Sequence, residues 1–156
     1  MVKSIVAVVI AVVTWFVVAT IGNWILRAAL PGYTAVEASM NFTLTMMICR
    51  LILGLVSSLS AGFVCAAIAH NRVAPKVAAA IMVLLFLPVH YMLWRNFPIW
   101  YHLFFLITLA PTMLIGAALK SDAGRPANNI HRSNAYGTNF LLSAASPRIL
   151  VAGDAL

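Results

Sequence analysis

Four long runs of apolar residues follow one another along the chain, and short polar segments separate them. The runs cover residues 4–26, 45–69, 77–94 and 99–119. A helix rises about 1.5 Å per residue, so an apolar run of about 17 to 25 residues is long enough to cross the hydrocarbon core of a bilayer. The pattern therefore predicts an all-α fold, that of a polytopic membrane protein with four transmembrane helices in a bundle.

The first apolar run directly follows Met1, Val2 and Lys3, a position that also suits a signal peptide. The apolar segment of a signal peptide has about 7 to 15 residues, and a cleavage site flanked by small residues follows it. The run over residues 4–26 is longer, and no such cleavage site follows it. We therefore interpret this run as the first membrane span.

Composition supports the membrane assignment. Hydrophobic residues make up 63% of the chain, charged residues make up 8%, and the mean hydropathy is +1.01. A water-soluble domain carries about 25% charged residues, so this composition excludes a soluble enzyme and a disordered chain. The formal net charge is +7, but no cluster of basic residues is large enough for a nucleic-acid site. We expect contact with the lipid bilayer and no nucleic-acid partner.

The basic residues also predict the orientation. Four spans place both termini on the same side, and Lys and Arg mark the cytoplasmic side of bacterial inner-membrane proteins. Counting only the early part of the tail, six basic residues lie on the side of the termini and three on the other side, so we expect both termini in the cytoplasm. The six are Lys3, Arg72, Lys76, Lys120, Arg125 and Arg132, and the three are Arg27, Arg50 and Arg95. Six aromatic residues gather at the opposite, outer ends of the spans: Trp24, Tyr33, Tyr91, Trp94, Trp100 and Tyr101.

The last part of the chain differs from the spans. Residues 120–156 are rich in Asn, Ser, Ala and Gly and include Pro126 and Pro147. Such a composition provides too few apolar residues for a core. We expect a transmembrane domain over residues 1–119, followed by a polar, disordered cytoplasmic tail.

A few polar side chains fall within the predicted spans or just outside them, all toward the outer leaflet. A charge in hydrocarbon costs a few kcal/mol or more, so such residues either extend to the interface or find partners inside the protein. Glu37 is the only acidic residue in 1–119 and is the natural partner of Arg27, Arg50 or Arg95. We expect an outer polar cluster, which is a candidate ligand-binding pocket formed by Asn23, Arg27, Glu37, Arg50, His90 and His102.

Two histidines flank the last helical hairpin. His90 and His102 can face each other across it, as a bis-histidine haem or metal site requires. However, no third ligand accompanies them, and the chain has no phosphate-binding loop, dinucleotide fingerprint or serine with a histidine and acid partner. We therefore expect no metal, no cofactor, no catalytic residue and no enzymatic activity.

The second span carries a stripe of small residues at every fourth position. Small residues let helix backbones approach closely, and this close packing drives helix association in lipid. The stripe therefore predicts either packing within the bundle or contact with another copy of the chain or a partner membrane protein. Its members are Gly54, Ser58, Gly62 and Ala66.

One segment carries a family resemblance. The sequence Asn96-Phe97-Pro98-Ile99-Trp100-Tyr101-His102, with Leu109-Ala110-Pro111 and Leu114-Ile115-Gly116-Ala117 after it, resembles the last hairpin of small four-helix bacterial inner-membrane proteins of uncharacterised function. The resemblance is closest over residues 96–117 and implies no reaction, cofactor or ligand.

Two hypotheses for the function follow from these features. The first is a multi-pass integral membrane protein that acts as a non-enzymatic structural or accessory subunit, through the small-residue face of the second span. The alternative is a small transporter or ligand-binding membrane protein with an outward-facing polar pocket.

Overall fold

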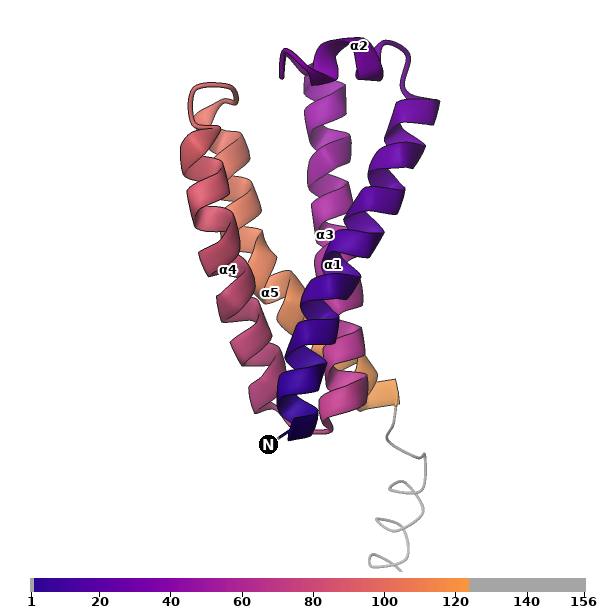
Figure 1. Cartoon of the computed structure of the whole chain (residues 1–156), viewed down its shortest axis with the longest axis vertical. Coiled ribbons are helices and arrows are strands. Elements are labelled where there is room, and N and C mark those ends of the chain that lie inside the picture. Colours follow the sequence, from indigo (N-terminus) through magenta and orange to yellow (C-terminus); the bar gives the residue numbers. More distant parts are fainter. Residues whose placement is uncertain (1, 124–156) are drawn as a thin grey trace, which may run out of the picture. The chain divides into compact units, whose positions relative to one another are not determined.

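Helices account for nearly all of the regular structure. The computed structural model describes residues 2–123 and places in them α1 (Val2–Ala29), α2 (Tyr33–Glu37), α3 (Leu44–Ala69), α4 (Val73–Met92) and α5 (Ile99–Ala123), with no strand (Figure 1). Four of these helices, α1, α3, α4 and α5, are long and apolar enough to cross a membrane. The predictions of an all-α chain and of four such helices are confirmed.

The helix boundaries differ from the predicted spans. α4 begins at Val73 rather than near residue 77, because the Oδ1 atom of Asn71 accepts the backbone N–H groups of Val73 and Ala74 at 3.0 and 2.9 Å. Pro75 lies in the first turn, where a missing N–H group costs little. α4 also ends at Met92, two residues before the predicted end.

Two helices end beyond their apolar runs. α1 reaches Ala29 and α5 reaches Ala123, because a charged residue ends an apolar run without ending a helix. The predicted tail over residues 120–156 therefore begins inside α5. The predicted disorder concerns residues 120–156, and residues 124–156 lie outside the part of the chain that the structure describes.

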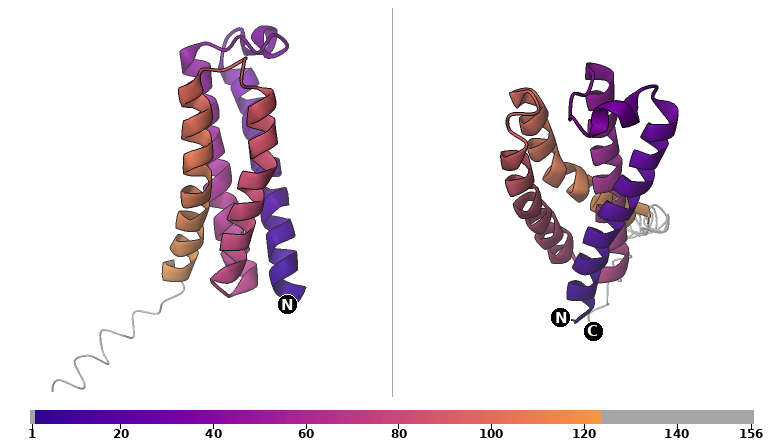
Figure 2. Two further views of the ribbon diagram at one scale, coloured as in Figure 1. Left: turned by 90° about the vertical axis from the view of Figure 1, so that its left-hand side faces the viewer. Right: turned by 45° about the horizontal axis from the view of Figure 1, so that its top comes forward.

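α3 is the central helix and packs against both α1 and α5, while α4 packs mainly against α5 (Figure 2). The backbones of α3 and α5 touch at two glycines, Gly62 on α3 and Gly116 on α5. A Cβ atom on Gly62 would lie 1.8 Å from the carbonyl oxygen of Met113, and one on Gly116 would lie 2.1 Å from that of Leu59. Only glycine permits this crossing, because any side chain would push the two helices apart.

The small-residue stripe of α3 is used within the chain. Gly54 lies against the ring of Phe105 on α5, and the Ser58 hydroxyl accepts a hydrogen bond of 3.1 Å from the indole Nε1 of Trp15 on α1. Gly62 is also buried, whereas Ala66 is only partly buried. The stripe therefore lies along the intramolecular contacts of α3 with α1 and α5.

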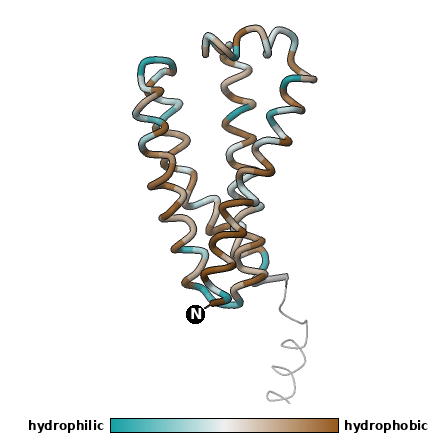
Figure 3. Tube along the Cα trace, in the orientation of Figure 1, coloured by the Kyte–Doolittle hydropathy of each residue, from teal (hydrophilic) through white to brown (hydrophobic). Residues whose placement is uncertain are grey.

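The surface of the helices is apolar, as contact with lipid requires. Hydrophilic positions concentrate near the ends of the helices, and the long middle sections are hydrophobic (Figure 3). The end that carries α2 and the turn between α4 and α5 is called the α2 end below. At the other end lie the start of α1 and the turn between α3 and α4, where Asn71 donates to the hydroxyl of Ser4 at 3.0 Å.

We predict that Gly62→Ala lowers the free energy of unfolding by about 1 to 3 kcal/mol, the usual cost of adding a carbon to a tightly packed site. The added carbon would overlap the Met113 carbonyl of α5. Thermal unfolding in detergent measures the change.

Val56→Leu is the matched control for this variant, because it adds one carbon to the same helix at an exposed position. Equal unfolding temperatures for the two variants would show that the contact between α3 and α5 does not limit stability.

Candidate functional site

Five polar side chains at the α2 end form one continuous series of hydrogen bonds, called the polar chain below. Arg27 donates to both carboxylate oxygens of Glu37, each at 2.9 Å, and Asn23 donates to Oε1 of Glu37 at 3.3 Å. The Tyr33 hydroxyl donates to Oδ1 of Asn23 at 2.8 Å and accepts from Nη1 of Arg50 at 2.6 Å. The polar chain therefore links α1, α2 and α3.

The local sequence explains how these residues meet. Asn23 and Arg27 are four residues apart on α1, so their side chains share one face of the helix. The backbone then turns at Gly32, whose φ of 74° suits glycine best, and α2 starts at Tyr33. This turn brings Tyr33 and Glu37 back over the end of α1.

Glu37 balances only one of the two arginines. Its hydrogen bond with Arg27 is the main reason why the pKa of this carboxyl group lies below its ordinary value, and the hydrogen bond from Asn23 acts in the same direction. Glu37 is therefore ionised at neutral pH and forms the ion pair with Arg27. The polar chain carries two positive charges and one negative charge.

Arg50 is the arginine of the polar chain that has no salt bridge with a carboxylate among the described residues. It is partly buried, and its partners are the hydroxyl of Tyr33, the neighbouring Tyr101 and the ring of Phe42, which lies 4.7 Å from the guanidinium carbon. Its buried Nε atom has no hydrogen-bond partner. These contacts involve neutral groups, so no carboxylate pairs directly with Arg50, and Glu37 interacts with it only through space.

Four aromatic side chains cover Arg50 at the α2 end and are called the aromatic roof below. Ring centroids are 5.2 Å apart for Tyr33 and Phe42, 5.9 Å for Phe42 and Phe97, and 4.7 Å for Phe97 and Tyr101. All four rings are buried. The roof joins the segment around α2 to the hairpin of α4 and α5.

His90 and His102 meet across the last hairpin. Their Nδ1 atoms lie 2.8 Å apart and share a hydrogen bond, and His102 is fully buried with no partner for its Nε2 atom. Trp94 stacks on His102 with ring centroids 5.1 Å apart. Within residues 2–120 no group of three or more potential metal ligands comes together.

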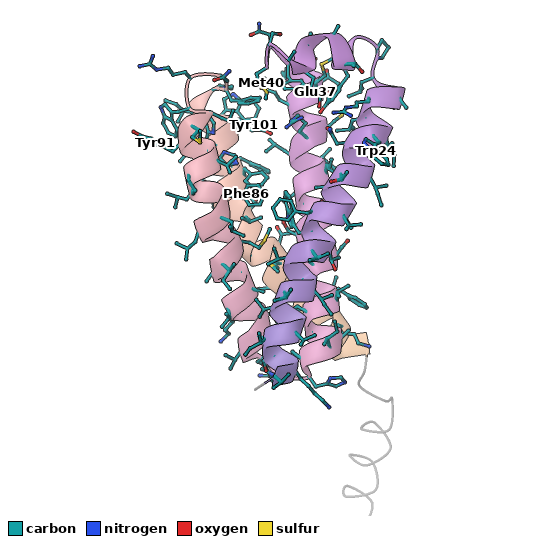
Figure 4. All side chains as sticks on the ribbon, viewed as in Figure 1. Trp24, Glu37, Met40, Phe86, Tyr91 and Tyr101 are labelled. Atoms are coloured by element: carbon teal, nitrogen blue, oxygen red, sulfur yellow. The ribbon has the colours of Figure 1, made fainter. Side chains whose placement is uncertain are left out.

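A cavity of about 350 Å³ lies between the helix pair α1 and α3 and the helix pair α4 and α5. Its polar lining comes from Thr20, Asn23, Arg27, Arg50, His90 and Tyr101, and the rest of the lining is mainly apolar and aromatic. Figure 4 shows Phe86 and Tyr101 between the two helix pairs and Trp24 on α1. The cavity is therefore a mainly apolar space with one arginine on its wall, Arg50, that has no direct carboxylate partner.

The structure brings all six candidate pocket residues to this region, although not all of them reach the cavity. Asn23, Arg27, Arg50 and His90 line it, whereas Glu37 and His102 lie behind Arg27 and His90, respectively. Arg95, the third candidate partner of Glu37, is exposed in the turn between α4 and α5.

Sequence reasoning missed the roles of Tyr33 and Tyr101, which it identified only as interfacial aromatics. The available signal was their position at the same depth as the arginines, because a buried tyrosine hydroxyl needs a hydrogen-bond partner.

The comparisons with known proteins give no family and no function. No protein-family model matches the chain, and the searches of curated proteins and of solved structures also found no match. The resemblance to small four-helix inner-membrane proteins therefore stays a prediction.

We predict that Tyr33→Phe destabilises the protein by about 1 to 3 kcal/mol, because Asn23 and Arg50 each lose a hydrogen bond in a buried setting. Thermal unfolding in detergent measures this loss. Tyr91→Phe, which removes the same hydroxyl from an 80% exposed position on α4, should unfold like the wild type. A Tyr33 variant as stable as the Tyr91 variant would contradict this role of the polar chain.

We also predict that the ion pair of Glu37 and Arg27 stabilises the protein only above acidic pH. The folded pKa of Glu37 is lower than its ordinary value of 4.5, so its contribution is complete above about pH 4.5 and disappears as the pH falls through the folded pKa. Unfolding temperatures of the wild type and of Glu37→Gln should differ at pH 7 and converge at acidic pH. An unchanged difference across this range would argue against the ion pair.

Proposed function

We propose that this chain is a non-enzymatic, ligand-binding membrane protein whose cavity holds a molecule with an oxyanion, either a carboxylate or a phosphate. The observation that carries the proposal is Arg50, a cation on the cavity wall with no carboxylate partner in residues 2–120.

Electrostatics supports this choice of ligand. A positive charge within a membrane span is costly, and proteins keep such charges near a partner or a functional pathway. Glu37 accepts hydrogen bonds from Nε and Nη2 of Arg27, so the hydrogen-bond partners of Arg50 are neutral. An oxyanion on a ligand would balance the charge and accept short, charge-assisted hydrogen bonds from the guanidinium group.

The cavity also fits a small, partly apolar molecule. Its volume of about 350 Å³ is at the lower end of the range of about 300 to 1,000 Å³ for small-molecule pockets. Most of its lining is apolar, and a few polar groups lie close together on one part of the wall. We infer that the ligand places its charged group at Arg50 and an apolar group among Trp15, Phe86 and Phe105.

The proposed location follows from the sequence. We place the protein in a bacterial inner membrane with both termini in the cytoplasm, because basic residues are more numerous on that side. The α2 end then faces outward, and the cavity lies in the outer half of the membrane.

The hypothesis of an accessory subunit has weaker support. It depended on the small-residue face of α3 as a contact with another chain. In the structure, Gly54, Ser58 and Gly62 on this face contact α1 or α5 of the same chain. A partner protein or a second copy would therefore need a different surface.

We predict that Arg50→Gln weakens anion binding about tenfold to a hundredfold, because hydrogen bonds to a charged group contribute about 1.5 to 3 kcal/mol. The probes are methyl phosphate and dodecyl phosphate, and titration calorimetry in an uncharged detergent measures their affinities. The wild type should bind at least one of them, and dodecyltrimethylammonium should not bind at this site.

Arg95→Gln is the matched control, since it removes the same charge from an exposed position at the α2 end. This variant should bind like the wild type. Equal affinities for the wild type and Arg50→Gln, or equal losses in both variants, would refute the proposed site.

A further inference from the structure

The sides of the cavity differ in how well they are closed. The gap between α1 and α3 is filled, because a Cβ atom on Gly22 of α1 would lie 2.1 Å from the Leu53 side chain of α3. Gly54 of α3 packs on Phe105 of α5, and the paired histidines join α4 to α5. Three of the four neighbouring helix pairs therefore form walls.

The fourth pair, α1 and α4, leaves an opening. These helices meet at Trp15 and Phe86, whose ring centroids lie 4.5 Å apart, and they diverge from there toward the α2 end (Figures 1 and 2). Above this contact, residues that line the cavity are also exposed on the outside. Phe16 is 47% exposed, Trp24 is 62% exposed and Val89 is 43% exposed. The opening faces sideways, where a membrane-spanning protein meets the acyl chains of the bilayer.

The aromatic roof closes the route to Arg50 from the α2 end. Phe42 lies over the guanidinium group, and Phe97 and Tyr101 continue the stack toward α5. A dissolved anion that approaches over Phe42, Phe97 and Tyr101 meets these buried rings before Arg50. A molecule that already lies in the bilayer can approach from the side, between α1 and α4.

We propose that the ligand is a membrane lipid with an anionic headgroup, which enters the cavity sideways between α1 and α4. This inference rests on the proposed function, since it names the source of the oxyanion that Arg50 binds. The headgroup occupies the polar part of the cavity, and the acyl chains extend through the opening past Phe16 and Val89 into the bilayer.

The histidine pair supports an anionic headgroup. The Nδ1 atom of His90 is used by His102, so Nε2 is the ring nitrogen of His90 that remains for a ligand. The Nε2 atom of His102 is buried without a partner, and an unpaired acceptor is tolerated better there than an unpaired N–H group. His102 therefore donates from Nδ1, and His90 carries its hydrogen on Nε2. Arg50 and His90 then both present donors to the cavity.

Native mass spectrometry of the full chain in an uncharged detergent tests the source of the anion. The probes are phosphatidic acid, phosphatidylcholine with the same acyl chains, and glycerol phosphate as the dissolved form of the headgroup. We expect one phosphatidic acid per chain, at least tenfold less phosphatidylcholine, and no displacement of the lipid by excess glycerol phosphate. Arg50→Gln should lose the bound phosphatidic acid, and Arg95→Gln should keep it.

Blocking the opening tests the route. Thr20 lines the cavity on the exposed side of α1, so Thr20→Phe should narrow the gap between α1 and α4 and lower the bound lipid at least tenfold. Val17→Phe is the matched control, because it adds a ring to the same helix at an exposed position away from the cavity. Val89→Phe narrows the same opening from α4, so the test does not depend on one variant folding well.

The outcomes separate the two proposals. Arg50-dependent binding of glycerol phosphate together with no lipid would overturn the lipid ligand and keep the anion site. Equal retention of phosphatidic acid and phosphatidylcholine would overturn the selectivity for an anionic headgroup. Unchanged lipid binding in both Thr20→Phe and Val89→Phe would overturn the route between α1 and α4. Binding of neither lipid nor dissolved phosphate would overturn both proposals.

Discussion

The close crossing of α3 and α5 sets the geometry of the whole transmembrane unit. Gly62 and Gly116 bring the two backbones into contact in the half of the helices away from α2. Lipid offers no hydrophobic driving force between helices, so such contact between complementary surfaces is what holds them together. Helices that touch here and cross at an angle must separate further along. The cavity at the α2 end is a result of that divergence, and the polar residues lie where the helices have moved apart.

Charge then determines what the divergent end can do. Two arginines and one glutamate meet there, and the polar chain distributes the hydrogen bonds so that Glu37 accepts from Arg27 and Asn23. Arg50 is connected to this group only through the hydroxyl of Tyr33. The arrangement stabilises the packing of α1, α2 and α3 and leaves a positive potential in the cavity. The proposed ligand recognition thus depends on the same few side chains as the stability of the fold.

Much of the fold was predictable because the apolar runs are long and well separated. The helix ends were less predictable. The Asn71 side chain, which accepts hydrogen bonds from the first backbone N–H groups of α4, gives no hydropathy signal. The gathering of six polar residues at one end of the helices was predictable from their positions along the chain, but their role as a pocket stays a prediction. The partner of Glu37 was not predictable, because it depends on the direction that α2 takes after the turn at Gly32. The roles of Tyr33, Tyr101 and the aromatic roof depend on contacts between helices far apart in sequence, which no local pattern encodes.

The hydrogen bond between Trp15 and Ser58 has a consequence for motion. An indole N–H group in the middle of a bilayer cannot form a hydrogen bond with water instead. Rotation of α1 about its own axis would therefore leave this donor unpaired. Ser58 lies on α3, which α5 in turn holds by the glycine crossing. The rotational setting of α1 is therefore fixed, with Phe16 held at the edge of the opening. Rotation of α1 therefore cannot widen that opening, and a wider opening requires α1 to tilt or α4 to move together with α5, to which the histidine pair joins it.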